Sequence, residues 1–354
     1  MTARSRLSRW MAAPLVAIVV CACTQPGTAT GSPGAPSESS PSPATARVRL
    51  ALDWTPNTNH SGFYVARANG WYEERFVDLE ILPYTGIAPE TLVAAGQAEC
   101  GISFQDAMTF AIAAGAPITS VMAILQHTAS EIAVLESSRF ERPRDLDGAT
   151  YAGFGYPNEV PTVRSVIVAD GGAGELEVVT LDSAAYEALY AGRADVTIVF
   201  TAWEGVEADL RGIALRTFRF TDYGFPDFYQ VLLACDARWL DSQPDVARRF
   251  VDATVRGFEV AALDPDSAAA ILVSENPGVF DAAPELPLES ALYLARGEYL
   301  LDDAGRFGPQ TLEQWRGYSG FLYTEGLLTG PDGAPLGAPP DYGSLFTNDF
   351  LPSP

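Results

Sequence analysis

The sequence predicts an α/β fold of two lobes, in which the first lobe is built from both ends of the chain and two crossing strands join the lobes around a ligand cleft. The roughly 300 residues after the first fifty suffice for one large or two medium domains with buried cores. Strand-length apolar runs alternate with helical patterns in two separate sets, as in parallel βαβ units. The last third of the chain is mainly helical and returns to cover the first lobe.

The first set of alternating patterns opens the first lobe. We expect strands at residues 48–54, 77–84 and 100–104 and helices at residues 62–74, 89–96 and 107–114. Two strand-like stretches follow at residues 117–126 and 131–137. The polar, proline-bearing residues 139–147 then form the exit from this lobe.

The second set predicts a smaller α/β lobe. We expect strands at residues 150–154, 176–180 and 194–200 and helices at residues 160–169 and 184–191. A further strand at residues 229–235 precedes helices at residues 244–262, 265–273 and 288–301. Lobe 1 is therefore assigned residues 47–138 and 235–354, and lobe 2 residues 139–234. One long doubly wound sheet with a helical cap is compatible with the same pattern.

The N-terminus has the organisation of an export signal. Arg4, Arg6 and Arg9 precede an apolar run at residues 11–20, which is about ten residues long and too short to span a membrane. Residues 20–23 resemble the bacterial lipobox, in which a small residue precedes a cysteine that becomes lipidated. Cys23 fits that pattern because Ala22 precedes it, so we expect a signal peptide at residues 1–22 and a lipid anchor on Cys23.

A flexible tether is expected between this cysteine and the folded part. Residues 23–46 are almost wholly Gly, Ser, Pro, Thr and Ala, and such a composition has too little apolar surface to offset the entropy of ordering. The tether would let a folded domain stay near the outer face of the cell membrane while remaining anchored to it.

The charge of the chain excludes some partners. The chain has 45 acidic and 22 basic residues, and its formal charge of −23 becomes −26 when the three signal arginines are removed. Nucleic acids and anionic lipid headgroups are therefore unfavourable partners.

The inventory of reactive side chains is small. All 22 basic residues are arginine, so Schiff-base chemistry on a lysine is excluded. Only Cys100 and Cys235 lie outside the signal region, and two buried free thiols are the default expectation, although one disulfide is possible in principle. With only His60 and His127 as histidines, no cluster has zinc-like spacing, and we expect neither a metal nor a cofactor.

The most informative segment lies between the first strand and the first helix. It reads LDWTPNTNHSGFYVA from Leu52 to Ala66 and crowds polar and aromatic groups into one strand-to-helix turn. Ligands of open α/β folds bind at this carboxyl edge of a parallel sheet, which makes Asp53, Trp54, Asn59 and His60 candidate binding residues. Helix capping by Asp53 and Asn59 and core packing of Trp54 explain the same residues equally well.

This segment resembles the signature of the NMT1/THI5-like family, and four later stretches are similar to it in order and spacing: residues 101–106, 130–135, 153–159 and 200–204. The resemblance implies the bilobal type II periplasmic-binding-protein fold. It also implies an extracytoplasmic solute-binding component of an ABC importer that captures formylaminopyrimidine or hydroxymethylpyrimidine, is a monomer, and delivers the ligand to a permease and its ATPase.

Family members hold a flat heterocycle by aromatic stacking and a few polar contacts. The matching aromatic residues at predicted strand ends are Trp54, Phe104, Tyr156, Trp203 and Tyr229. Glu159 and Glu204 are the carboxylates that would pair with the amine and ring nitrogen of an aminopyrimidine, and Gln105 completes the predicted set. At the start of a helix, Glu159 is equally explained as a capping carboxylate.

Two other classes of function compete with this one. Relatives of the yeast type are pyrimidine synthases that use a Schiff-base lysine and a cysteine-rich motif, both of which this chain lacks, so we expect no enzyme. A sensor that binds the same ligand would share every feature. Among binding proteins, riboflavin and sulfonates are alternative ligands, but an anion would recruit arginine, which is absent from the candidate segments.

Overall fold

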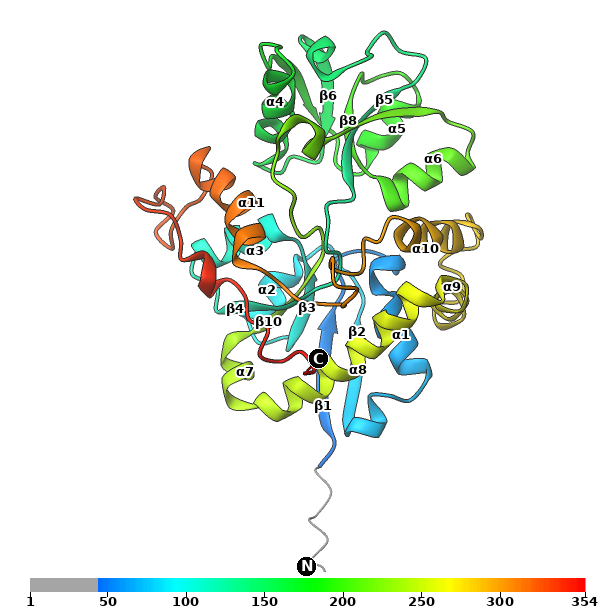
Figure 1. Cartoon of the computed structure of the whole chain (residues 1–354), viewed down its shortest axis with the longest axis vertical. Coiled ribbons are helices and arrows are strands. Elements are labelled where there is room, and N and C mark those ends of the chain that lie inside the picture. The colour runs from blue at the N-terminus through cyan, green and yellow to red at the C-terminus, as the bar shows by residue number, and fades with distance from the viewer. Residues whose placement is uncertain (1–43, 354) are drawn as a thin grey trace, which may run out of the picture. The chain divides into compact units, whose positions relative to one another are not determined.

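The computed structural model describes residues 44–353, and within them a five-stranded sheet forms the core of lobe 1, as can be followed in Figure 1. Its strand order is β2-β1-β3-β10-β4, with β1 parallel to β2 and β3, and β10 antiparallel to β3 and β4. The strands are β1 (Ala46–Ala51), β2 (Val77–Leu82), β3 (Cys100–Ser103), β4 (Ile118–Ala123) and β10 (Leu232–Asp236). The carboxyl ends of β1, β2 and β3 thus meet at one edge, where a binding site is expected.

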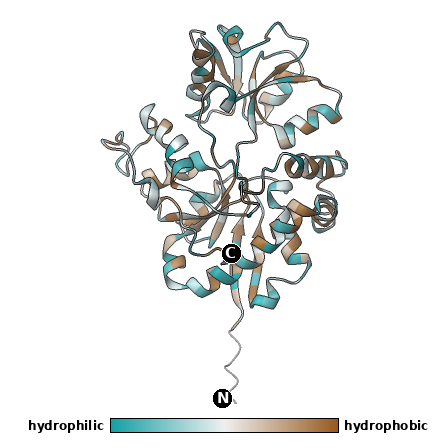
Figure 2. Cartoon of the chain, viewed as in Figure 1, coloured by the Kyte–Doolittle hydropathy of each residue, from teal (hydrophilic) through white to brown (hydrophobic). Residues whose placement is uncertain are grey.

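Helices cover both faces of this sheet. Alternate strand residues such as Leu50 and Leu233 pack against one group of helices, and their neighbours Ala51 and Leu232 pack against another. The first group is α1 (Ser61–Ala68), α8 (Pro244–Leu263), α9 (Pro265–Glu275) and α10 (Leu286–Arg296). The second group is α2 (Pro89–Ala94), α3 (Gln105–Ala113) and α11 (Leu312–Thr324), while α7 (Ala237–Ser242) follows β10. Figure 2 shows hydrophobic residues concentrated on the strands and on the helix faces turned toward them.

Helices α1 and α8 approach each other closely at two glycines. A Cβ atom on Gly257 of α8 would clash with the carbonyl of Gly62, and a Cβ atom on Gly62 would clash with the ring of Phe258. These two positions need glycine because no side chain fits between the helices. The contact fixes α1, and therefore the loop that precedes it, against the sheet.

Lobe 2 contains two further sheets. Strands β5 (Ser130–Leu135), β8 (Thr197–Phe200) and β9 (Leu215–Arg219) pair antiparallel in the order β8-β5-β9. Strands β6 (Ala149–Gly153) and β7 (Leu176–Thr180) pair in parallel, and a bridge between Tyr151 and Val196 joins them to the segment before β8. Helices α4 (Glu159–Ala169), α5 (Ala184–Tyr190) and α6 (Val206–Leu210) complete the lobe.

Strand pairing corrects the predicted lobe boundaries in two places. Strand β5 was assigned to lobe 1 but pairs with β8 and β9 of lobe 2. Strand β10 was placed largely in lobe 2 but completes the sheet of lobe 1. The sequence pattern shows that a strand exists but carries no information about which strand it pairs with. The crossing segments are therefore residues 124–129 and 220–231.

The cysteines correct a second expectation. Cys100 of β3 and Cys235 of β10 stand opposite each other in the antiparallel pair and form a disulfide, instead of two free thiols. The two residues are fully buried and lie 135 positions apart in the sequence. The bond therefore fastens the returning strand β10 to the middle of the lobe 1 sheet.

Several helix ends differ from the predicted ones. Helix α1 ends at Ala68 because Gly70 takes a left-handed conformation, and a short 3-10 turn at Glu73–Arg75 replaces its predicted end. Helix α10 ends at Arg296, and α11 was not predicted at all. The predicted signal peptide, Cys23 and nearly all of the tether lie outside the described residues. None of the helices within residues 44–353 combines the length and hydrophobicity that a membrane span requires.

Candidate functional site

The loop after β1 is organised around a buried histidine. His60 Nε2 lies 2.7 Å from Asp53 Oδ1, and His60 Nδ1 accepts a hydrogen bond from the backbone N–H of Asn57 at 3.2 Å. These contacts require the tautomer with a proton on Nε2, which donates to Asp53. His60 is fully buried, so it positions the Asp53 carboxylate and does not face solvent.

The other polar residues of this loop also shape its backbone. Asn57 accepts a hydrogen bond from the backbone N–H of Asn59 at 2.9 Å, as in a helix cap. Asn59 is buried, and its side-chain oxygen has no partner among the described residues. The capping interpretation therefore holds for this segment. The capping residue is Asn57, and not Asp53 or Asn59 as the sequence had suggested.

Trp54 behaves differently from these buried neighbours. It is 38% exposed at the end of β1, and its ring lies 5.5 Å from the ring of Tyr84, which follows β2. The alternative in which Trp54 packs in the core is therefore wrong. Two aromatic faces from adjacent strands are available to a ligand at this edge.

The first turns of α2 and α3 bring further carboxyl groups to the same edge, those of Glu90 and Asp106. Glu90 accepts a hydrogen bond from the hydroxyl of Ser103, and its pKa is raised by burial and by the nearby charges of Asp53 and Asp106. Burial also raises the pKa of Asp106. Phe104 lies between Ser103 and α3 and is half-buried against the core. The edge is thus acidic as well as aromatic.

Gln105 and Tyr229 are fastened inside lobe 1. Gln105 Nε2 donates to the carbonyls of Gln314 and Trp315, and its Oε1 accepts from the backbone N–H of Tyr229 at 3.0 Å. The Tyr229 hydroxyl accepts from the backbone N–H of Thr311 at 2.7 Å. Both residues are buried, and their polar groups are used in joining α3, α11 and the second crossing segment, so we leave them out of the proposed site.

In lobe 2, Glu159 organises the loop after β6. Its carboxylate accepts from the Tyr151 hydroxyl at 3.0 Å and from the backbone N–H groups of Phe154 and Tyr156 at 3.0 and 3.2 Å. Burial raises its pKa, although these hydrogen bonds oppose the shift. The capping interpretation thus accounts for Glu159, while the loop that it holds presents Tyr156, which is 67% exposed.

Glu204 carries one of several buried polar atoms of lobe 2 that have no hydrogen-bond partner among the described residues. It lies in a π-helical turn, Thr201–Gly205, directly after β8, and its Oε2 is buried without a hydrogen-bond partner among the described residues. Burial raises the pKa of Glu204 to about 8, so the group is largely a neutral acid at pH 7. π-Helical turns are frequent at functional sites. Neighbouring Trp203 packs edge-on against Phe280 of lobe 1, with ring centroids 6.4 Å apart.

Polar contacts also join the two lobes. Asn158, just before α4, donates to Asp106 Oδ2 at 2.7 Å and to the Tyr318 hydroxyl at 2.8 Å. Asp106 and Tyr318 belong to α3 and α11 of lobe 1. The strand-end loops of the two lobes therefore come together beside Asp106.

The chain matches the family model described as NMT1/THI5 like over residues 57–268, which is more than half of its length. It belongs to this family. It is 27% identical to the formylaminopyrimidine-binding protein of Halalkalibacterium halodurans over 290 residues, which cover 80% of this chain and 87% of that protein. It is 21% identical to a 4-amino-5-hydroxymethyl-2-methylpyrimidine phosphate synthase of Saccharomyces cerevisiae over 325 residues, or 88% of this chain and 89% of the synthase.

Solved structures show the fold of this NMT1/THI5-like chain. The alkanesulfonate-binding protein SsuA from Xanthomonas axonopodis pv. citri superposes with a TM-score of 0.61 at 16% identity, covering 81% of this chain and 96% of that one. The predicted type II periplasmic-binding-protein fold is therefore confirmed. At this level of identity the likeness concerns the fold and not the ligand.

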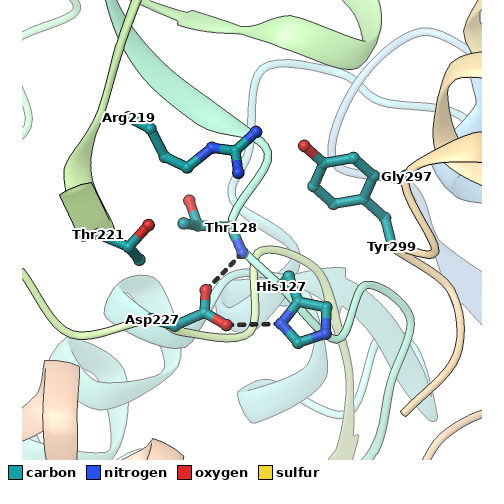
Figure 3. A pocket seen from close by; sticks show the side chains of 7 residues that line it. All are labelled: His127, Thr128, Arg219, Thr221, Asp227, Gly297 and Tyr299. Carbon is teal, nitrogen blue, oxygen red and sulfur yellow. Dashed lines mark hydrogen bonds and ion pairs between the residues drawn. The ribbon is translucent and has the colours of Figure 1, made fainter. Parts of the chain in front are cut away.

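A separate cavity lies where the crossing segments of this family member meet. Its volume is about 500 Å³, and Figure 3 shows its lining residues: His127, Thr128, Arg219, Thr221, Asp227, Gly297 and Tyr299. His127 Nδ1 lies 2.6 Å from Asp227 Oδ2, and Asp227 Oδ1 accepts from the backbone N–H of Thr128 at 3.0 Å. The hydrogen bond with Asp227 raises the pKa of His127. These contacts tie one crossing segment to the other, and none of the predicted site residues lines this cavity.

Sequence reasoning missed Tyr84, Asp106 and Asn158 of the strand-end loops. Tyr84 is the last residue of the strand predicted at residues 77–84. Because the other aromatic candidates were chosen at predicted strand ends, its position could have identified it as a candidate. Asp106 and Asn158 stood inside stretches similar to the family, but nothing in the sequence showed that they would meet. Within residues 44–353, no three histidine, cysteine or acidic residues are grouped as metal ligands.

Proposed function

We propose that this protein is the extracytoplasmic solute-binding component of an ABC importer and that it captures a flat aminopyrimidine, formylaminopyrimidine or hydroxymethylpyrimidine, between its lobes. The observation that carries the proposal is that exposed aromatic residues and buried acids follow strand ends in both lobes. Trp54 and Tyr156 present exposed rings, while Glu204 has a buried Oε2 without a hydrogen-bond partner among the described residues. The similarity to a formylaminopyrimidine-binding protein supports the choice of ligand.

The chemistry of Glu204 suits this ligand. An aminopyrimidine has an exocyclic amine beside a ring nitrogen, so it offers a donor and an acceptor side by side. A neutral carboxylic acid complements that edge, since its O–H donates to the ring nitrogen and its carbonyl oxygen accepts from the amine. Transfer of the proton to the ring would give a charge-assisted pair. Asp53, held by His60, supplies a second acceptor beside Trp54.

The proposed role is binding without chemistry. A pyrimidine synthase that forms a Schiff base needs a lysine, and the chain contains none. Closure of the lobes would bury the ligand, and the importer would recognise the closed form. A sensor with the same ligand would differ in having no permease partner.

The cellular setting belongs to the same proposal. We place the mature chain as a monomer on the outer face of the cell membrane, anchored through Cys23 and working with a permease and its ATPase. The Cys100–Cys235 disulfide supports an oxidising compartment, where such bonds persist.

A binding titration tests the proposal. The chain without residues 1–22 and with Cys23→Ser is titrated calorimetrically with formylaminopyrimidine, hydroxymethylpyrimidine, thiamine, riboflavin and taurine. We expect a pyrimidine to bind with a Kd of about 1 μM or tighter. Trp54→Ala and Glu204→Gln should each weaken binding, whereas exposed Leu263→Ala and Glu177→Gln should not. If only riboflavin binds, the assigned ligand changes from a pyrimidine to riboflavin. If no compound binds, the proposal is contradicted.

A further inference from the structure

The cavity at the meeting point of the crossing segments, named the hinge cavity from here on, is bordered by several distant parts of the chain. Its lining comes from the two crossing segments, from the end of β9 in lobe 2 and from the turn after α10 in lobe 1. None of the residues proposed for the pyrimidine lines this cavity. A molecule bound there would therefore be a second ligand.

The turn that carries Tyr299 into the hinge cavity has a strained backbone. Glu298 has a φ of 56°, a left-handed conformation that residues other than glycine rarely adopt. A Cβ atom on Gly297 would lie 2.4 Å from the Tyr299 ring, so this turn requires glycine there. The Tyr299 carbonyl accepts a hydrogen bond from the backbone N–H of Gln126 at 2.7 Å, and its ring stacks on Tyr293. Strain of this kind is often retained where it places a functional side chain.

Arg219 faces Tyr299 across the hinge cavity. Figure 3 shows the guanidinium and the phenol hydroxyl directed toward each other. Arg219 Nε lies 3.3 Å from Glu131 Oε1, a contact that does not use the two terminal nitrogens of the guanidinium. Burial and the neighbouring Tyr293 raise the pKa of Tyr299, so its hydroxyl keeps its proton and can donate. Donors from the two lobes therefore converge in one cavity.

The carboxylate in the lining, that of Asp227, is already occupied. Its oxygens accept hydrogen bonds from the backbone N–H groups of Thr128 and Phe228 at 3.0 Å each, and from His127 Nδ1 at 2.6 Å. A protonated His127 also balances the negative charge of Asp227 at close range. A ligand in this cavity therefore meets mainly hydrogen-bond donors.

We propose that the hinge cavity is a second binding site, which takes a small oxoanion, a carboxylate or a phosphate, with Arg219 and Tyr299 as its main contacts. Two oxygens of such an anion match the terminal nitrogens of a guanidinium, and the hydroxyls of Tyr299 and Thr221 supply neutral donors. The volume of about 500 Å³ leaves room for an organic group attached to the anion. The chain is acidic, but charges more than about 8 Å away are largely screened at physiological ionic strength, so the nearby guanidinium matters most.

Protonation of His127 should favour the anion. The hydrogen bond with Asp227 raises the pKa of His127, although partial burial opposes the shift. Below that pKa the imidazolium offsets Asp227, and above it the cavity loses one positive charge. The affinity for an anion should therefore fall as the pH rises through the pKa of His127. The titratable and charged groups around His127 are Asp227, Asp303, Arg219, Glu131 and Tyr299.

Calorimetry tests the site directly. The chain without residues 1–22 and with Cys23→Ser, in a buffer free of phosphate and sulfate, is titrated with inorganic phosphate, sulfate and succinate. We expect saturable binding of at least one anion with a Kd of about 1 mM or tighter. Arg219→Gln should weaken binding at least about 10-fold and Tyr299→Phe roughly 2- to 10-fold, as expected for a charged and a neutral hydrogen bond. Exposed Arg193→Gln, also in lobe 2, is the matched control and should bind like wild type.

The pH dependence is measured with sulfate, which stays fully ionised, at about pH 5.5 and pH 8.5. Wild type should bind more tightly at the lower pH, and His127→Gln should lose most of this difference. The same pH dependence in both proteins would overturn the role of His127.

The remaining outcomes separate this site from the proposed function. No saturable binding of any anion up to about 20 mM, or equal affinity in wild type and Arg219→Gln, would overturn the site. Melting curves show whether the variants are folded, and Arg219→Lys, which keeps the charge but not the fork, should fall between wild type and Arg219→Gln. Arg219→Gln should still bind the pyrimidine, so a failure to bind pyrimidine in wild type concerns the proposed function alone.

Discussion

Glu204, which we propose as a ligand-binding residue, should also carry a cost for folding. Its Oε2 is buried without a partner among residues 44–353, and burial raises its pKa from 4.5 to about 8. Between these two pH values the folded protein keeps a proton that the unfolded chain has released. The free energy of unfolding therefore falls as the pH rises through this window, and it levels off above about pH 8.

Replacing this carboxyl group should remove that dependence. We expect Glu204→Gln to raise the stability of the unliganded protein by about 1–3 kcal/mol at pH 8–9 relative to wild type, because an amide avoids the cost of burying an unpaired charge. Urea unfolding at pH 5 and pH 9 measures the effect, with exposed Glu177→Gln as the control. Equal differences between variant and wild type at both pH values would contradict the raised pKa.

At the same scale, the sequence predicted which segments would form the site better than the role of each residue. Trp54 and Tyr156 are exposed after β1 and β6, whereas Glu204 has a buried Oε2, and contact of these three residues with a ligand stays a prediction. Gln105 and Tyr229 come from equally plausible strand ends but point into lobe 1, where they bond to each other and to α11. Helix α11 lies more than 200 positions after Gln105 in the sequence. Contacts over such distances leave no local pattern.

Among the elements, the pair β3 and β10 carries a disulfide whose contribution to the free energy of unfolding can be tested. Their disulfide joins cysteines 135 positions apart and so restricts a long loop of the unfolded chain. Strand pairing explains why the expectation of free thiols failed: spacing along the chain does not show that Cys235 returns beside Cys100.

The double variant Cys100→Ala/Cys235→Ala should lose about 2–5 kcal/mol of unfolding free energy. Urea unfolding followed by tryptophan fluorescence gives the value, and wild type unfolded in the presence of a reductant should shift by a similar amount. Unchanged urea midpoints in both experiments would show that the bond does not form in solution.

For the whole molecule, contacts between the lobes set how readily the cleft closes. The two-lobe α/β organisation followed from the alternating patterns, but the contacts across the cleft did not, since they depend on how complete lobes meet. Asn158 is central among them because it bonds to both α3 and α11. Losing these bonds should shift the equilibrium toward open forms.

We therefore expect Asn158→Ala to weaken ligand binding about 2- to 10-fold, since the closed state becomes a smaller fraction of the ensemble. Small-angle X-ray scattering should show a larger radius of gyration for the unliganded variant than for wild type. Asn69→Ala, which removes a bond within lobe 1 alone, is the control. Identical scattering and affinity in wild type and Asn158→Ala would show that this contact does not govern closure.

The disulfide also restricts where the molecule can bend. It joins the ends of β3 and β10 that are farther from the cleft, while Leu232 pairs with Ser103 beside the cleft. Strand β10 therefore cannot slide along the sheet when the second lobe moves, and the motion must come from backbone rotations in residues 124–129 and 220–231. The His127–Asp227 contact joins these two crossing segments to each other, so rotation of one segment should be coupled to rotation of the other. Ligand-induced changes in amide exchange should accordingly centre on those two segments and leave β3 and β10 unaffected.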